Sequence, residues 1–226
     1  PDIEDDEPEC VLPLLIPTPN QKRRTGESQN HFIINPKTGR LTGGSSQLYL
    51  EMYHFVGQFL GIALRSNVHL DLLLPSIVWK ALVGESLEWE DLELFDSSSC
   101  HVLRELISLC DTGVLEEESD DLIQEILDEL SWSATISDGS EVDVRTGLIK
   151  DDKDDLVTEK WNIDKIIRYC KGNIKCRLLE SQAALRAMSE GLRSVVPACA
   201  LGIFSWYELE LRVCGRSEID INLLKR

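Results

Sequence analysis

Apolar side chains recur every three or four residues along several stretches of this chain, a spacing typical of amphipathic helices. The longest stretch runs from 46 to 67, with Gly57 and Gly61 one turn apart on it. Because two such glycines leave a smooth patch, we expect another helix to pack closely there. The same spacing predicts helices at 75–82, 99–110, 119–130, 161–179 and 182–195.

The last helix is predicted from its end signals as well as from its spacing. Ser205 and Glu208 have the spacing of a capping box, in which each side chain bonds the other residue's backbone N–H. Gly215 follows Cys214 and is a typical residue just beyond a helix end. A short helix from 206 to 214 is therefore expected.

Two pairs of short segments have the pattern of strands. Residues 11–16 and 31–34 are apolar runs that end near prolines, with a polar loop between them. Apolar and polar residues alternate over 132–137 and again over 142–144, on either side of the turn dipeptide Asp138-Gly139. That arrangement predicts a β-hairpin. The fold class is therefore α+β and mainly helical, with a small hairpin nested between helices.

Composition and charge restrict the partners. With 226 residues, 42% hydrophobic and 28% charged, the chain can bury a sizeable core. Its net charge of −17 would repel nucleic acid and anionic membranes, so neither is expected as a partner. Between Glu105 and Glu159 there are 18 acidic residues against three basic ones. This segment is either a solvated acidic face or a docking face for a basic protein.

Cysteine and histidine usage gives little sign of a chemical site. The seven cysteines form no CxxC pair, and their odd number favours reduced thiols. With no secretion signal at the start, an intracellular location, cytoplasmic or nuclear, is expected. The histidines and cysteines are scattered and no phosphate-binding glycine motif occurs, so neither a metal nor another cofactor is expected.

A nucleophilic cysteine is a weak alternative. Cys100 and His101 are neighbours on a predicted helix, where adjacent side chains diverge, so they make a poor dyad. Cys214 lies at the end of an amphipathic helix and has the pattern of a small buried side chain. A cysteine hydrolase using either residue stays open as the less favoured hypothesis.

Several motifs, in one order along the chain, carry a family resemblance. The segments LIPTPN at 15–20, FIINP at 32–36 and FVGQFLGIALR at 55–65 resemble the opening of the HECT ubiquitin-ligase domain. Later segments are similar to the rest of that family's N-terminal lobe: Val68–Leu72, Val78–Lys80, Glu90–Leu92, Ile149, Val157-Thr158, Asn162, Met188–Leu192, Glu208–Gly215 and Glu218–Asp220. The IPTPN opening and Asp111-Thr112-Gly113 look most like the large HERC and HECTD-type members.

The resemblance implies a function in ubiquitin transfer. The N-terminal lobe of a HECT ligase holds a ubiquitin-conjugating enzyme, and a C-terminal lobe carries the cysteine that accepts ubiquitin before a substrate lysine does. That cysteine follows a threonine, whereas none of the seven cysteines here does. We expect the catalytic cysteine to lie outside this chain, which alone should be inactive. The implied partners are a conjugating enzyme, ubiquitin and the protein's own C-terminal lobe.

The resemblance also implies a division into two subdomains. Residues 1–100, with an acidic lead-in at 1–10, and 193–226 would form the large subdomain, and 101–192 a small one that binds the conjugating enzyme. The acidic excess of the middle segment agrees with such a role, since conjugating enzymes commonly present a basic helix and an apolar loop tip. The candidate docking residues come from two helices: Leu103, Leu106, Ile107 and Leu109 on one, and Trp161, Ile163 and Ile166 on the other.

Two alternatives remain beside the hypothesis that this lobe recruits a conjugating enzyme. For each candidate residue, simple core packing competes with a docking role. If the surface formed by these candidate residues no longer binds a conjugating enzyme, the lobe would be a pseudo-ligase scaffold.

Overall fold

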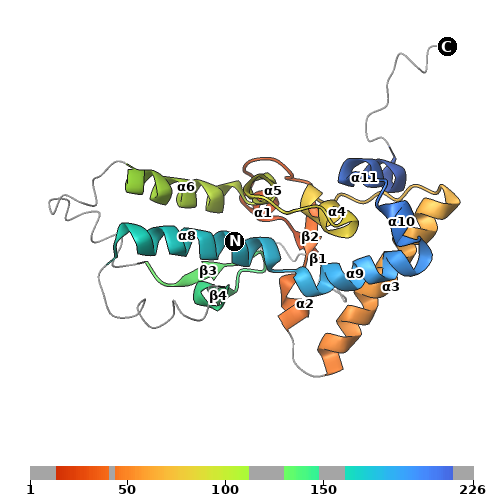
Figure 1. Cartoon of the computed structure of the whole chain (residues 1–226), viewed down its shortest axis with the longest axis horizontal. Coiled ribbons are helices and arrows are strands. Elements are labelled where there is room, and N and C mark those ends of the chain that lie inside the picture. Colours follow the sequence, from red (N-terminus) through yellow and green to blue (C-terminus); the bar gives the residue numbers. More distant parts are fainter. Residues whose placement is uncertain (1–13, 41–43, 112–129, 148–160, 216–226) are drawn as a thin grey trace, which may run out of the picture.

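The computed structural model describes residues 14–40, 44–111, 130–147 and 161–215, which form a mainly helical α+β structure (Figure 1). None of the helices within these ranges has both the length and the apolar character needed to cross a membrane. The elements are β1 (Leu15–Pro17), α1 (Pro19–Arg23), β2 (Phe32–Ile34), α2 (Pro36–Arg40), α3 (Gly44–Ser66), α4 (Ser76–Val83), α5 (Trp89–Phe95), α6 (Ser97–Asp111), β3 (Ser133–Thr135), β4 (Glu141–Asp143), the 3-10 helix η1 (Val144–Gly147), α8 (Ile163–Leu179), α9 (Gln182–Val195), α10 (Ala198–Leu201) and α11 (Trp206–Cys214).

The fold class and most of the predicted elements are confirmed. β1 pairs antiparallel with β2, and β3 with β4, so the hairpin around Asp138-Gly139 is present. The capping box of α11 is formed, because Ser205 Oγ accepts a hydrogen bond from the Glu208 N–H and the Glu208 carboxylate accepts one from the Ser205 N–H. The predicted helix at 119–130 and the lead-in at 1–10 lie outside the described residues.

The sequence pattern does not predict four of the short helices, α1, α2, α5 and α10. In α1, Thr18 caps the helix by accepting the Gln21 N–H at 3.1 Å, and Pro19 is the first helical residue. From the sequence, the prolines around Thr18 indicate only the end of a strand. Helices of four to seven residues show too little periodicity to be detected from apolar spacing.

The IPTPN segment holds the first strand against α5 and α6 through a buried amide. Asn20 is fully buried and makes four side-chain hydrogen bonds. Its Nδ2 donates to the carbonyls of Glu27 and Leu94, and its Oδ1 accepts from the N–H and hydroxyl of Ser97. Because every polar atom of this amide has a partner, its burial carries little penalty.

Helices α3 and α9 pack closely at the positions where glycines occur. A Cβ added to Gly57 would lie 1.9 Å from the Met188 carbonyl oxygen, and one added to Gly191 would lie 1.9 Å from that of His54. The close packing predicted at Gly57 and Gly61 is therefore confirmed, and Gly191 supplies the matching surface on α9. Only glycines allow the two backbones to approach this far.

The buried apolar side chains form two clusters. The larger contains residues of β2, α3, α4, α5, α9, α10 and α11 and Cys100 from the first turn of α6, and the smaller contains residues of the rest of α6, β3, η1 and α8. Leu185, Met188 and Leu192 of α9 belong to the larger cluster. The predicted end of the small subdomain at 192 therefore does not match the packing, since the chain rejoins the larger cluster where α9 begins. The helical pattern of 182–195 gives no signal about which cluster its apolar face enters.

Replacing Gly57 with alanine should destabilise the protein although alanine favours helices by about 1 kcal/mol. The added methyl group would force the α3 and α9 backbones apart, so we expect a loss of about 2 kcal/mol or more in the free energy of unfolding, measured by urea denaturation. Gly202→Ala is the control, because a Cβ there would come no nearer than 3.6 Å to another residue's atoms. Equal stability of the Gly57 variant and wild type would show that the helices are not in close contact.

Candidate functional site

The smaller cluster is built around α8. Helix α6 lies along one side of α8 and the β3–β4 hairpin lies along the other (Figure 1). Asn162 caps the start of α8 by accepting the Lys165 N–H at 2.8 Å. The C-terminal end of α6 and the first turn of α8 therefore lie together at the end of the molecule far from α3 and α9.

The seven predicted docking residues divide into a buried and an accessible group. Leu103, Leu106 and Ile166 are only 3%, 6% and 0% exposed and form part of the small core. They offer a partner little surface in this conformation. This burial agrees with the alternative that these residues simply pack in the core. In the accessible group, Leu109 and Trp161 are partly exposed and pack against this core, Ile107 is 37% exposed, and Ile163 is partly exposed.

Three aromatic rings meet beside the accessible group. Trp132 stacks on Trp161 with ring centroids 5.0 Å apart, and Tyr169 packs edge-on against both rings. The sequence pattern predicts Trp161 as a site residue but does not predict its neighbours Trp132 and Tyr169. The alternation that predicts the hairpin places Trp132 on the same face as Ala134. This shared face is the sequence signal that Trp132 packs toward the small core. We call Ile107, Leu109, Trp132, Trp161 and Ile163 the distal apolar patch.

The charge near this patch differs from the expected acidic face. Most of the 18 acidic residues of the middle segment lie at 116–129 and 151–159, outside the described residues. Helix α8 itself carries five basic residues and one acidic residue. Among the described residues, the acidic docking face predicted from the sequence is therefore not seen.

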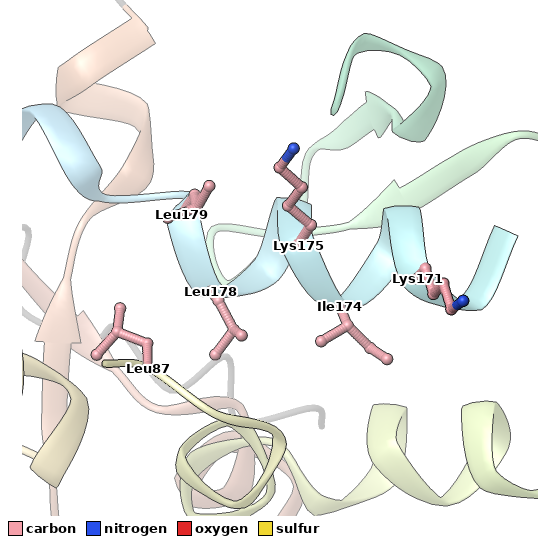
Figure 2. Close-up of a pocket in the computed structure, with 6 residues that line it drawn as sticks. All are labelled: Leu87, Lys171, Ile174, Lys175, Leu178 and Leu179. Carbon is pink, nitrogen blue, oxygen red and sulfur yellow. The ribbon is translucent and has the colours of Figure 1, made fainter. Parts of the chain in front are cut away.

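A second apolar surface lies where the small cluster meets the large one. A groove of about 390 Å³ runs along α8, lined by Leu87, Ile174, Leu178 and Leu179 together with two lysines. In Figure 2, Leu87 approaches Leu178 from the segment before α5, while the amino groups of Lys171 and Lys175 point away from the apolar side chains. The sequence pattern does not predict this groove, because nothing around Leu87 in the sequence indicates that it faces α8.

A buried guanidinium joins the two clusters. Arg177, near the end of α8, is 1% exposed. It donates one hydrogen bond to Asp96 at 2.5 Å and another to Glu180, whose side chains are 2% and 3% exposed. Asp96 lies between α5 and α6 and also pairs with Arg23 of α1 at 2.9 Å. Two bases and two acids therefore form one electrically balanced network around the buried guanidinium.

The hairpin is fixed to the same network. The Ser137 hydroxyl donates to Glu180 at 2.5 Å, and the Ser137 N–H donates to the same carboxylate at 3.2 Å. Burial raises the pKa of Glu180, although the guanidinium of Arg177 opposes this shift. Lys22 of α1 donates to the Ser137 carbonyl at 3.1 Å. These bonds fix the hairpin, α8 and the large subdomain relative to one another.

Cys100, Cys170 and Cys214 are poor nucleophiles in this structure. Burial raises the pKa of Cys100 and of Cys170 to about 12, and that of Cys214 to about 11. Cys100 is 0% exposed, whereas the side chain of His101 is 72% exposed and lies near Glu105. A thiol must ionise to attack, so these environments argue against the cysteine-hydrolase hypothesis.

Comparison with known families identifies the chain. The model of the HECT domain (ubiquitin-transferase) family matches residues 13–226, which is nearly the whole sequence. The chain belongs to the HECT family. The motifs at 15–20, 32–36 and 55–65, on which the resemblance was based, are thus those of a HECT domain.

Its relatives place this HECT domain near the HERC and HECTD-type members. The E3 ubiquitin-protein ligase HERC2 of Mus musculus is 31% identical over 215 residues, which cover 95% of this chain. The probable E3 ubiquitin-protein ligase HECTD4 of Homo sapiens is 30% identical over 226 residues, also 95% of the chain. The E3 ubiquitin-protein ligase TOM1 of Saccharomyces cerevisiae is 25% identical over 209 residues, 92% of the chain. The chain spans 4%, 5% and 6% of the length of these three relatives.

Loss of the buried guanidinium should be costly. In an Arg177→Ala variant, Asp96 and Glu180 would be left buried beside each other, so we expect a loss of about 3–5 kcal/mol in the free energy of unfolding. Arg104→Ala is the matched control, because Arg104 pairs with Glu93 at 2.9 Å on the surface and should contribute less than about 1 kcal/mol. Urea denaturation measures both, and similar losses in the two variants would contradict the network's role.

Thiol reactivity should follow burial and pKa. Near neutral pH, iodoacetamide should modify the exposed Cys199 well before Cys100, Cys170 or Cys214. Because the thiolate is the reacting form, alkylation of these three should speed up about tenfold per pH unit while the pH stays below their pKa and the fold persists. Peptide mass spectrometry gives the rates. A rapid reaction of Cys100 or Cys214 at neutral pH would revive the hydrolase hypothesis.

Proposed function

We propose that this HECT-domain chain recruits a ubiquitin-conjugating enzyme and holds it for transfer of ubiquitin to a cysteine of the protein's C-terminal lobe, and from there to a substrate lysine. The single observation that carries the docking site is the distal apolar patch. It combines partly exposed aromatic and aliphatic side chains, of which Leu109, Trp132 and Trp161 pack against the small core. Buried aromatic anchors surrounded by accessible apolar positions are typical of protein interfaces.

The patch has the support that a docking site needs. Stacking of Trp132 on Trp161 and the edge contacts of Tyr169 restrict the three rings before any partner arrives. A surface that is already ordered loses less conformational entropy on binding. Leu103, Leu106 and Ile166 would act from below, by fixing the patch residues rather than by contacting the partner.

Transfer between two proteins also needs a fixed orientation. The Arg177 network ties the small subdomain to the large one, so an enzyme bound at the distal end would be held at a defined position relative to the rest of the lobe. Such positioning lowers the barrier by turning an encounter into an intramolecular step. The thioester itself would form on a cysteine outside this chain, since the raised pKa values of Cys100, Cys170 and Cys214 disfavour that role here.

One observation favours the pseudo-ligase scaffold as a second candidate. Apart from Arg177, whose charge Asp96 and Glu180 balance, the basic residues of α8 lie on the helix that starts beside the patch, and they would weaken the approach of an enzyme with a basic helix. If the chain does recruit a conjugating enzyme, we propose that the acidic segments at 116–129 and 151–159 offset the positive charge of α8. Binding that weakens as salt increases would support that compensation.

The test is binding of the chain to a panel of ubiquitin-conjugating enzymes by isothermal titration calorimetry. We expect saturable binding to at least one enzyme, and we expect Ile107→Asp to weaken it about tenfold or more, because a charge would enter an apolar contact. Ile107 is 37% exposed, so the variant should keep its fold. Leu106 is unsuitable for this test, because its burial means that Leu106→Asp would disrupt the small core.

Ile203→Asp is the control. Ile203 is 79% exposed and follows α10, at the end of the molecule far from the patch (Figure 1), so its change should leave affinity within about twofold. Equal effects of the two substitutions would reject the distal patch as the docking site. Absence of binding to every enzyme, with a folded chain, would favour the scaffold.

A further inference from the structure

Helix α3 carries an apolar stripe that no described element covers. Its members are Leu48, Met52, Phe55, Phe59 and Ile62, and we call this stripe the α3 seam. Leu48, Phe55, Phe59 and Ile62 are 53%, 64%, 47% and 51% exposed, and Met52 is partly exposed. Four large apolar side chains, each about half exposed and lying in one row, form a patch of the kind that marks a binding surface.

The spacing of the α3 seam is that of a two-helix interface. Successive members are four, three, four and three residues apart, which is the alternation of a heptad repeat. On a helical wheel the seam lies nearly opposite Gly57 and Gly61, whose face is occupied by α9. The helix has 23 residues, so about three heptads are available to a second helix without disturbing the α3–α9 packing.

One edge of the seam carries charges that complement each other across a two-fold axis. Glu51, Gln58 and Arg65 follow one another at intervals of seven residues along this edge. Glu51 accepts a hydrogen bond from Gln47, and Arg65 donates to the Val195 carbonyl at 3.4 Å. Among the described residues, neither Glu51 nor Arg65 has an ion-pair partner.

We propose that two copies of this chain associate through the α3 seam as an antiparallel pair of helices. With the two-fold axis beside Gln58, Glu51 of each copy faces Arg65 of the other, because both lie seven residues from the axis. Phe55 then packs against Phe59 of the second copy, and Met52 against Ile62. A parallel pair would bring no opposite charges together along this edge, so the charges select the antiparallel arrangement.

The occupant is a second copy because the surface is complementary to itself. An isologous interface requires that one patch supply both halves of each contact, and the seam supplies the acid, the base and matched apolar layers. The proposal stands apart from the proposed function, since the distal apolar patch lies at the other end of the molecule (Figure 1).

Sedimentation equilibrium of the 226-residue chain over a concentration series tests the proposal. We expect a monomer–dimer equilibrium that Phe55→Asp abolishes while circular dichroism stays unchanged, because Phe55 is 64% exposed. Glu51→Arg or Arg65→Glu alone should raise the dissociation constant about tenfold, since each places like charges opposite one another twice.

Mixing the two single-charge variants, Glu51→Arg and Arg65→Glu, is the sharpest step. In the mixed pair, the arginine introduced at position 51 of the first variant would face the glutamate introduced at position 65 of the second. The native Arg65 of the first variant would likewise face the native Glu51 of the second. Because both contacts then join opposite charges, the mixture should form a heterodimer with nearly wild-type affinity.

The control is Glu27→Arg, an equal charge change away from α3, which should leave association unchanged. A wild-type chain that stays monomeric at every concentration would overturn the proposal. So would a dimer whose dissociation constant is indifferent to residues 51, 55 and 65.

Discussion

The arrangement of this lobe depends on the burial of Arg177 between two carboxylates that come from different parts of the chain. Asp96 belongs to the junction of α5 and α6, and Glu180 follows α8, so one guanidinium fixes the end of α8 against the large subdomain. Removing charges from water is expensive, and the network is tolerable only because each charge has an opposite partner and hydrogen bonds satisfy most of the remaining polar atoms. The β3–β4 hairpin is joined to this network, because the Ser137 hydroxyl donates a hydrogen bond to Glu180.

This network explains how a small cluster can present a rigid surface. Among the described residues, the smaller core contains seven buried hydrophobic residues, so its position depends on further contacts with the rest of the lobe. The α3–α9 pair supplies the stable base, where reciprocal glycines allow close backbone contact. The ionic network then holds α8 in a fixed orientation relative to the rest of the lobe, and α8 in turn positions the distal apolar patch.

Sequence patterns predict the long elements well and the site only in part. The helix predicted at 182–195 has the bounds of α9, because a strongly amphipathic stretch reports its own periodicity. The same periodicity does not indicate whether an apolar face is buried in a core or exposed to a partner. Leu103, Leu106 and Ile166 were therefore candidates for docking, although they are buried in the core. Short caps and contacts across the chain, such as Trp132 on Trp161, depend on tertiary packing. The pairing of Arg177 with Asp96 joins residues 81 positions apart, and no local pattern reports it.

The central claim is that this HECT domain receives a ubiquitin-conjugating enzyme at the distal end of its small subdomain. The most direct measurement is a titration of the isotope-labelled chain with a binding enzyme, followed by amide and tryptophan indole chemical shifts at low and high salt. The account predicts shifts confined to the end of α6, the first turn of α8 and Trp132, with weaker binding at high salt. Saturable binding that shifts only α3, α9 or α11, and leaves Trp132 and Trp161 unchanged, would contradict it.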